Sequence, residues 1–164
     1  MDEVDGSSSY TIDIPNGGLS YVIGNLLQQG INTDNSVMLP YGAEGFSSDG
    51  RLREIYIVNN TFVNDRGSGA FVSLSGGTSV AKLINNIFMG GGSLPGGSAE
   101  LVTNLNVDDA ELNDSAAFDY RLAATSPARD SGSSPGSAHG FSLAPAYDYL
   151  HSASREPRRS VVSI

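Results

Sequence analysis

The side chains that most often carry out catalysis are sparse in this sequence. The chain has two histidines, His139 and His151, and neither has a further ligand at the spacing of a zinc site. It has no cysteine, which excludes thiol chemistry and a disulfide framework. The Gly-x-Ser-x-Gly turn of many hydrolases and the glycine-rich loop that binds phosphate are also missing. Carboxylates, arginines and one lysine, Lys82, are left as the groups that could take part in chemistry.

An acidic cluster in the last third of the chain offers oxygen ligands. It consists of Asp108, Asp109, Glu111 and Asp114. Carboxylate oxygens are the ligands that Ca²⁺ prefers in proteins. The cluster lacks the spacing and the glycine of an EF-hand loop, so a solvated loop is the favoured interpretation and no metal site is predicted. Ca²⁺ stays open as the only cofactor that these residues could take.

The strands and corners that would position these charged side chains are indicated by a repeated sequence motif. Two near-copies, 55–63 and 81–89, each consist of a short apolar strand, a pair of asparagines and a second short apolar strand. A weaker copy occupies 21–27, and a degenerate one occupies 101–107. A phrase that returns at intervals of roughly 20–30 residues is typical of β-solenoids. The asparagines at the predicted corners are Asn25, Asn59, Asn60, Asn85, Asn86 and Asn104.

Asparagine suits a sharp corner between strands because it tolerates the left-handed backbone conformation. If successive repeats stack, the corner amides can hydrogen-bond to one another and so avoid burial without partners. The alternation places Ile57 and Phe62 inside, and Tyr56 and Lys82 on the outer face. In the fourth copy Asn106 falls at the position of Phe62, which predicts that the repeat breaks up there.

The sequence therefore predicts an all-β fold, a parallel β-solenoid of about three to four coils with an irregular C-terminal tail. Residues 1–9 are acidic and serine-rich and are expected to form a flexible N-terminus. The coils are expected over 10–107 and a capping and trailing segment over 108–164. Segments 10–14, 37–39 and Ala70–Leu74 are expected to form the third side of the coils.

The longest insertion between coils is 41–53. Long insertions in solenoids cluster on one side and often build the binding groove. We therefore expect this insertion to contribute the substrate-binding residues, with a mobile loop around a partly buried Phe46 as the alternative. The candidates are Tyr41, Glu44, Arg51 and Arg53.

Four stretches resemble a known family. The units VNNTF (58–62) and INNIF (84–88) resemble the right-handed parallel β-helix proteins of the pectin-lyase-like group. The stretch DYRLAATSPARDSG (119–132) is similar to the segment that commonly follows the last coil in that family, and 141–160 is similar to its trailing segment. The resemblance covers roughly residues 10–160 and implies a right-handed β-helix.

The resemblance also implies polysaccharide as the partner. Lyases of this fold use arginine or lysine to remove the proton next to a uronate carboxyl, and hydrolases of this fold use carboxylates. Neither set can be matched residue by residue here. By position, the resemblance points to Asp65 and Arg66, on the turn that leads into Ala70–Leu74, with the insertion bordering the same groove. The alternative is that these are ordinary surface charges.

The charge of the chain narrows the range of partners. The formal net charge is −9, with a pI near 4.4, so neither nucleic acid nor an anionic membrane is an expected partner. No run reaches the roughly 18 apolar residues of a membrane span, and no signal peptide is visible at Met1. The family resemblance nevertheless implies a secreted or cell-surface protein, present here as a mature form or a piece.

Two functions remain open. The first is the carboxy-terminal part of a carbohydrate-active β-helix protein that binds or cleaves polysaccharide in the manner of a lyase. The second is a non-catalytic β-helix module for adhesion, binding or self-assembly. An abrupt first coil leaves strand edges without partners, which predicts either upstream coils or end-to-end association.

Overall fold

The computed structural model describes residues 7, 9–152 and 154–158. The predicted flexible N-terminus therefore lies outside the described residues apart from Ser7 and Ser9. Within the described part the chain is all-β, with parallel sheets. No helix in it has the length and apolar character of a membrane span.

Three parallel sheets contain the first ten strands. Sheet one has the order β1 (Ser20–Ile23), β4 (Glu54–Val58), β7 (Val80–Ile84) and β9 (Glu100–Val102). Sheet two has the order β2 (Leu26–Gln29), β5 (Thr61–Asn64), β8 (Ile87–Gly90) and β10 (Leu105–Val107). Sheet three pairs β3 (Val37–Tyr41) with β6 (Ala70–Leu74).

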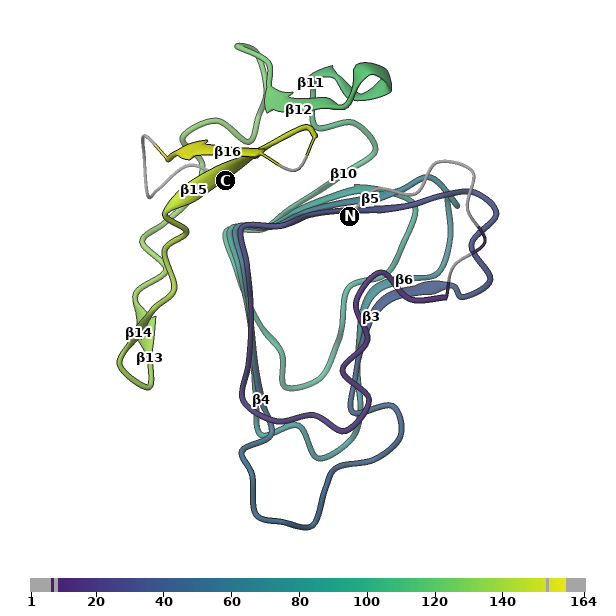
Figure 1. Ribbon diagram of the computed structural model, residues 1–164, viewed down its shortest axis with the longest axis vertical. Helices are drawn as coiled ribbons and strands as arrows, with labels where there is room; N and C mark the ends of the chain where they lie inside the picture. Colours follow the sequence, from purple (N-terminus) through teal and green to yellow (C-terminus); the bar gives the residue numbers. More distant parts are fainter. Residues whose placement is uncertain (1–6, 8, 153, 159–164) are drawn as a thin grey trace.

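Consecutive strands are distributed over different sheets, which divides the chain into four layers. Layer one is β1–β3, layer two is β4–β6, layer three is β7–β8 and layer four is β9–β10. In layer three Ser93 forms a single bridge to Ala70 where a third strand would lie. Figure 1 looks through the layers, with the sheets as three sides of one outline and layer one nearest the viewer.

One predicted strand is wrong. Over 10–14 only Ile14 forms a bridge, to Tyr41. The backbone N–H groups of Thr11 and Ile12 both donate to the carbonyl oxygen of Met38, so the chain bends there instead of running in register along β3. Sheet three therefore has two strands and not the expected three.

The predicted inward positions form the core. Val22, Ile57 and Leu83 are paired in register across sheet one, and all three are buried. In sheet two Phe62 lies beside Phe88, and their rings stack with centroids 5.0 Å apart. An aromatic pair of this kind contributes about 0.5–1.5 kcal/mol beyond the area it buries. The core therefore lies between the three sheets.

The first residue of each corner has a positive φ. The values are 67° at Gly24, 52° at Asn59, 55° at Asn85 and 49° at Thr103. Glycine and asparagine adopt this region more readily than other residues, which explains their presence at three of the four corners. The predicted turning role of the corners is confirmed.

The remaining strands form antiparallel hairpins in the C-terminal part. These are β11 (Leu112–Asp114) with β12 (Asp119–Leu122), joined through the short helix η1 (Ser115–Ala117), then β13 (Ser137–Ala138) with β14 (Phe141–Ser142), and β15 (Tyr147–Leu150) with β16 (Ser154–Pro157). Figure 1 shows β13–β16 along the outside of the layers.

The trailing segment covers the outer face of sheet one. Tyr56 lies on that face, as the alternation predicts, but only 6% of it is exposed. It packs in one cluster with Ala138 and Leu143. The hydroxyl of Tyr21 donates to the carbonyl oxygen of Ala138 at 3.2 Å. The trailing segment therefore buries part of this outer face, whereas Lys82, in register with Tyr56, keeps a side chain that is 38% exposed and pairs with Glu100 at 2.8 Å.

Candidate functional site

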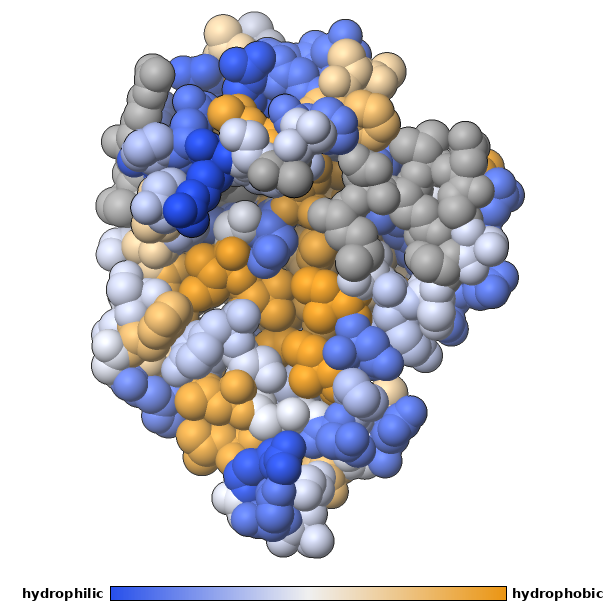
Figure 2. All heavy atoms as spheres, viewed as in Figure 1, coloured by the Kyte–Doolittle hydropathy of each residue, from blue (hydrophilic) through white to orange (hydrophobic). Residues whose placement is uncertain are grey.

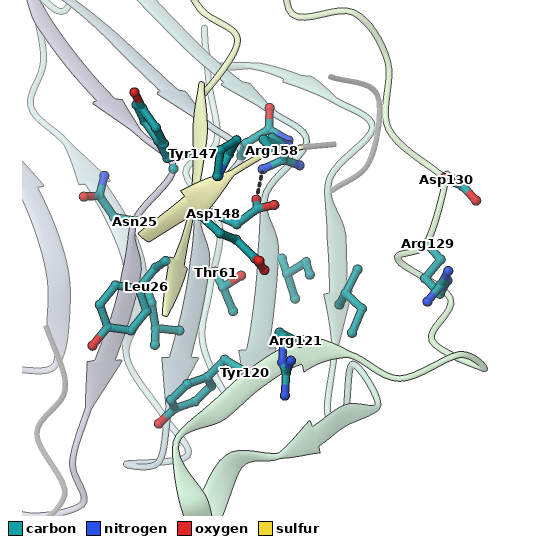
Figure 3. Close-up of a pocket in the computed structure, with 17 residues that line it drawn as sticks. Asn25, Leu26, Thr61, Tyr120, Arg121, Arg129, Asp130, Tyr147, Asp148 and Arg158 are labelled. Carbon is teal, nitrogen blue, oxygen red and sulfur yellow. Dashed lines mark hydrogen bonds and ion pairs between the residues drawn. The ribbon is translucent and has the colours of Figure 1, made fainter. Parts of the chain in front are cut away.

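A groove lies on the outer face of sheet two. It has a volume of about 480 Å³ and lies between the β11–β12 and β15–β16 hairpins (Figure 3). Its floor contains Leu26, Thr61 and Ile87, which are paired in register in layers one to three. The residues on its walls include Tyr120, Arg121, Arg129, Asp130, Tyr147, Asp148, Tyr149, Glu156 and Arg158.

An ion pair fixes the β15–β16 wall. Asp148 and Arg158 approach to 3.0 Å, and the Arg158 side chain is only 9% exposed (Figure 3). Burial lowers the pKa of Arg158, although an arginine remains charged at any ordinary pH. The pair holds the end of the hairpin beside the floor of the groove.

A hydrogen-bond relay fixes the opposite wall. The Tyr120 hydroxyl donates to Gln28 Oε1 at 2.8 Å, and Gln28 Nε2 donates to Asp65 Oδ2 at 2.6 Å. Gln28 is buried, so both ends of its amide are satisfied inside the protein. The relay connects β12 to sheet two.

The two predicted catalytic residues hold structural contacts. Asp65 is the acceptor of the Gln28 amide in this relay. The Arg66 guanidinium donates to the carbonyl oxygen of Thr33, and its backbone N–H donates to Asn64 Oδ1 at 3.2 Å. Both residues lie on the turn between β5 and β6, as predicted.

The predicted substrate-binding residues of the insertion do not form one surface. Tyr41 is fully buried, and its hydroxyl donates to the carbonyl oxygen of Gly18. Arg53 lies over the ring of Phe46, 5.0 Å from its centroid, while Glu44 is exposed. Arg51 pairs with Asp49, which raises the pKa of Arg51 and lowers that of Asp49.

The insertion and the Asp65–Arg66 turn lie at opposite ends of sheet three. The insertion follows β3, the turn precedes β6, and the two strands are parallel. A strand of five residues is about 16 Å long, so the two sets are separated by about the length of the strand. That they border one groove stays a prediction.

The second asparagine of each corner belongs to a continuous series of hydrogen bonds. Asn25 Nδ2 donates to Asn60 Oδ1 at 3.0 Å, Asn60 Nδ2 to Asn86 Oδ1 at 3.0 Å, and Asn86 Nδ2 to Asn104 Oδ1 at 2.8 Å. Asn60 and Asn86 are buried, so the series satisfies amides that have no access to water. The first corner residues form a second series, in which Asn85 Nδ2 lies 3.5 Å from Asn59 Oδ1.

The acidic cluster serves the local backbone. Asp109 accepts from the Glu111 N–H, and Asp114 caps η1 by accepting from the Ala117 N–H. Among the described residues no group of three potential ligands lies close enough to hold a metal ion. Nearby, Arg121 pairs with Asp119 at 2.5 Å, and this hydrogen-bonded pair lowers the pKa of Asp119 to about 2.

Sequence reasoning missed most of this groove. Tyr147 and Tyr149 alternate on β15, so an exposed aromatic pair could have been read from the sequence. No local pattern indicates that this strand lies beside Leu26, because the two are more than a hundred positions apart in the chain.

Comparisons of this chain with family models, with curated proteins and with solved structures find no match. The likeness to pectin-lyase-like proteins therefore stays a prediction from the sequence.

Proposed function

We propose that this chain is a β-solenoid that binds a polysaccharide in the groove on sheet two without cleaving it. The four layers and their parallel register support the solenoid, and the likeness of the repeat supports the right-handed, pectin-lyase-like form. The observation that carries the proposal is a groove with both apolar and polar residues in its floor and three tyrosines, Tyr120, Tyr147 and Tyr149, among its lining residues.

Such a surface suits a sugar chain for two reasons. Aromatic rings combine a broad apolar face with a polar edge, and the C–H faces of pyranose rings stack on them. Sugar hydroxyls both donate and accept, so they are recognised by neighbouring guanidinium and carboxylate groups. Tyr147 is 44% exposed and Tyr149 is 37% exposed. The Arg155 guanidinium lies over the Tyr147 ring, 4.1 Å from its centroid, so a sugar would stack on the other face of that ring.

The balance of charge in the groove favours a neutral polysaccharide over a uronate polymer. Three arginines and three carboxylates line it, and Asp148 with Arg158 forms an internal pair. A site for a polyanion would carry an excess of cations. The expected ligand is therefore a chain of uncharged sugars, held by stacking and hydrogen bonds.

Binding without cleavage is the better supported form. The lyase hypothesis depends on Asp65 and Arg66, whose charged groups hold contacts within the fold. Catalysis by these two residues would require their contacts with Gln28 and Thr33 to break. Binding in the groove requires no such change.

Affinity electrophoresis in gels that contain neutral glucans, mannans or xylans would test the proposal. The protein should be retarded by at least one neutral polysaccharide, and Tyr147→Ala should weaken binding about tenfold, as expected for the loss of one stacking ring. Phe141→Ala is the matched control, because Phe141 is an exposed ring on the same segment that does not line this groove. Equal binding by both variants, or release of unsaturated sugars measured by ultraviolet absorbance, would contradict the proposal.

A further inference from the structure

The asparagine series has a direction that runs through all four layers. In layers one to three the second corner asparagine donates both its backbone N–H and its Nδ2 to the Oδ1 of the corresponding asparagine in the next layer. The bonds from Asn25 to Asn60 are 2.9 and 3.0 Å, and those from Asn86 to Asn104 are 2.9 and 2.8 Å. The two ends of the series are therefore chemically different.

Layer one ends in an acceptor. Asn25 is exposed, and no donor within the described residues contacts its Oδ1. In the same layer β1 pairs only with β4, which leaves its other edge unpaired in the described part of the chain. Figure 2 shows apolar side chains gathered at the centre of this face, inside the outline of the strands.

Layer four ends in donors. Asn104 Nδ2 donates to the carbonyl oxygen of Leu83 at 2.7 Å, and within the described chain its backbone N–H has no acceptor. Among the described strands, β9 pairs only with β7. Leu101, on β9, is 45% exposed although it occupies an inward position, in register with Leu83.

The two faces match in register as well as in hydrogen bonding. The column that contains Leu101 begins at Val22, and the column that contains Asn104 begins at Asn25. One further layer below β9 would therefore place an inward apolar residue on Leu101 and an Oδ1 acceptor under Asn104. Layer one supplies both.

We propose that layer four of one copy of this chain stacks on layer one of a second copy. β9 then pairs with β1 of that copy in parallel, and Asn104 donates to its Asn25 Oδ1. Val22 of that copy is only 6% exposed, with Ile12 and Ile14 packed against the same cluster, so the apolar gain comes from covering Leu101. The contact joins two different faces, so it repeats head to tail and is not limited to a dimer. Asn106 stands opposite Leu27 in this arrangement and keeps the contact weak on the side of sheet two.

Light scattering over a range of protein concentrations tests the stacking. The average mass should rise with concentration beyond that of a dimer, and Leu101→Glu should return the protein to a monomer. Leu52→Glu is the matched control, because Leu52 is 43% exposed but lies in the insertion, away from both faces. A monomer at every concentration, or an equal loss of association in both variants, would overturn the proposal.

Cross-linking tests the register. The chain has no cysteine, so Val22→Cys with Leu101→Cys introduces a single defined pair. Three layer spacings of about 4.8 Å separate these positions within one copy, which is too far for an internal disulfide. Oxidation should give a ladder of dimers, trimers and larger species on non-reducing gels. The control pair Leu52→Cys with Leu101→Cys should not give this ladder, and an equal ladder from the control would refute the register.

Discussion

At the level of single residues, Glu54 connects the layers to the trailing segment. Its Oε2 lies 2.7 Å from His139 Nε2 and accepts from the Tyr56 hydroxyl at 2.9 Å. The hydrogen bond to His139 is the main cause that lowers the pKa of Glu54, and burial, with Glu54 beside it, raises the pKa of Tyr56 to about 12. The ionised carboxylate is thus the form that the folded protein favours.

This shift predicts a loss of stability in acid. A carboxyl whose pKa is lower in the folded protein contributes stability above its ordinary pKa of 4.5 and loses it as the pH falls through the folded value. The difference in unfolding free energy between the wild type and Glu54→Gln should therefore be largest at neutral pH and should shrink below about pH 4.5. Urea unfolding at a series of pH values measures it. Glu44→Gln is the control, and the prediction fails if the Glu54→Gln difference does not change with pH.

At the scale of the residue, the sequence predicted corner geometry better than chemistry. Asn59 and Asn85 were placed correctly because a turning residue is selected by its own backbone. Asp65 and Arg66 were chosen by position, and their partners, Gln28 and Thr33, lie more than thirty positions away. The spacing of residues along the sequence does not predict hydrogen-bond partners at such a separation.

At the level of the elements, the fourth corner is the least favourable one. Thr103 has a φ of 49°, and a β-branched residue is a clear outlier in this region. Its hydroxyl donates to Asn85 Oδ1, which continues the series made by the first corner residues. Layer four therefore keeps its hydrogen bonds at the cost of backbone strain.

Replacing Thr103 should stabilise layer four. Thr103→Asn supplies a residue that tolerates positive φ and an Nδ2 that can donate to Asn85 Oδ1. We expect a gain of about 1 kcal/mol and a rise in Tm of about 2–4 °C. Calorimetry of this variant beside Thr125→Asn, which changes an exposed threonine without positive φ, measures the effect. An unchanged or lower Tm for Thr103→Asn would show that the hydroxyl matters more than the strain.

The elements that could be predicted are those whose signal is periodic. The alternation placed Ile57 and Phe62 in the core because strand side chains have a period of two. It failed over 10–14, where two backbone N–H groups share one carbonyl oxygen and the alternation does not describe a strand. Hydrophobic pattern alone does not distinguish a strand in register from a bent segment of similar composition.

At the level of the whole molecule, the groove exists only because the chain returns to its first layers. Gly24, Asn25 and Leu26 of layer one share the groove with Tyr147 and Tyr149 of the trailing segment. Figure 1 shows β13 to β16 running along the outside of the layers to reach this place. The floor of the groove is thus part of the repeat, whereas both of its walls belong to the C-terminal part of the chain.

The docking of the trailing segment depends on a small apolar contact. Leu143 is 2% exposed and packs with Tyr56, Val58 and Ile84 on the outer face of sheet one. Its backbone N–H donates to the carbonyl oxygen of Gly136 at 3.0 Å, which closes the β13–β14 turn. A charge at this position would be buried without a partner, at a cost of several kcal/mol.

Leu143→Asp should therefore release the trailing segment without unfolding the layers. Proteases should then cut between 131 and 158, and retardation by polysaccharide should be lost together with the β15 wall, while the β-sheet circular dichroism persists. Leu52→Asp, on the exposed insertion, should keep both protection and binding. The layers should persist because the core between the three sheets includes Phe62, Phe71 and Phe88. These residues belong to a different cluster from Leu143. Collapse of the β signal in Leu143→Asp would mean instead that the segment is required for the layers to fold, and that groove and core form as one unit.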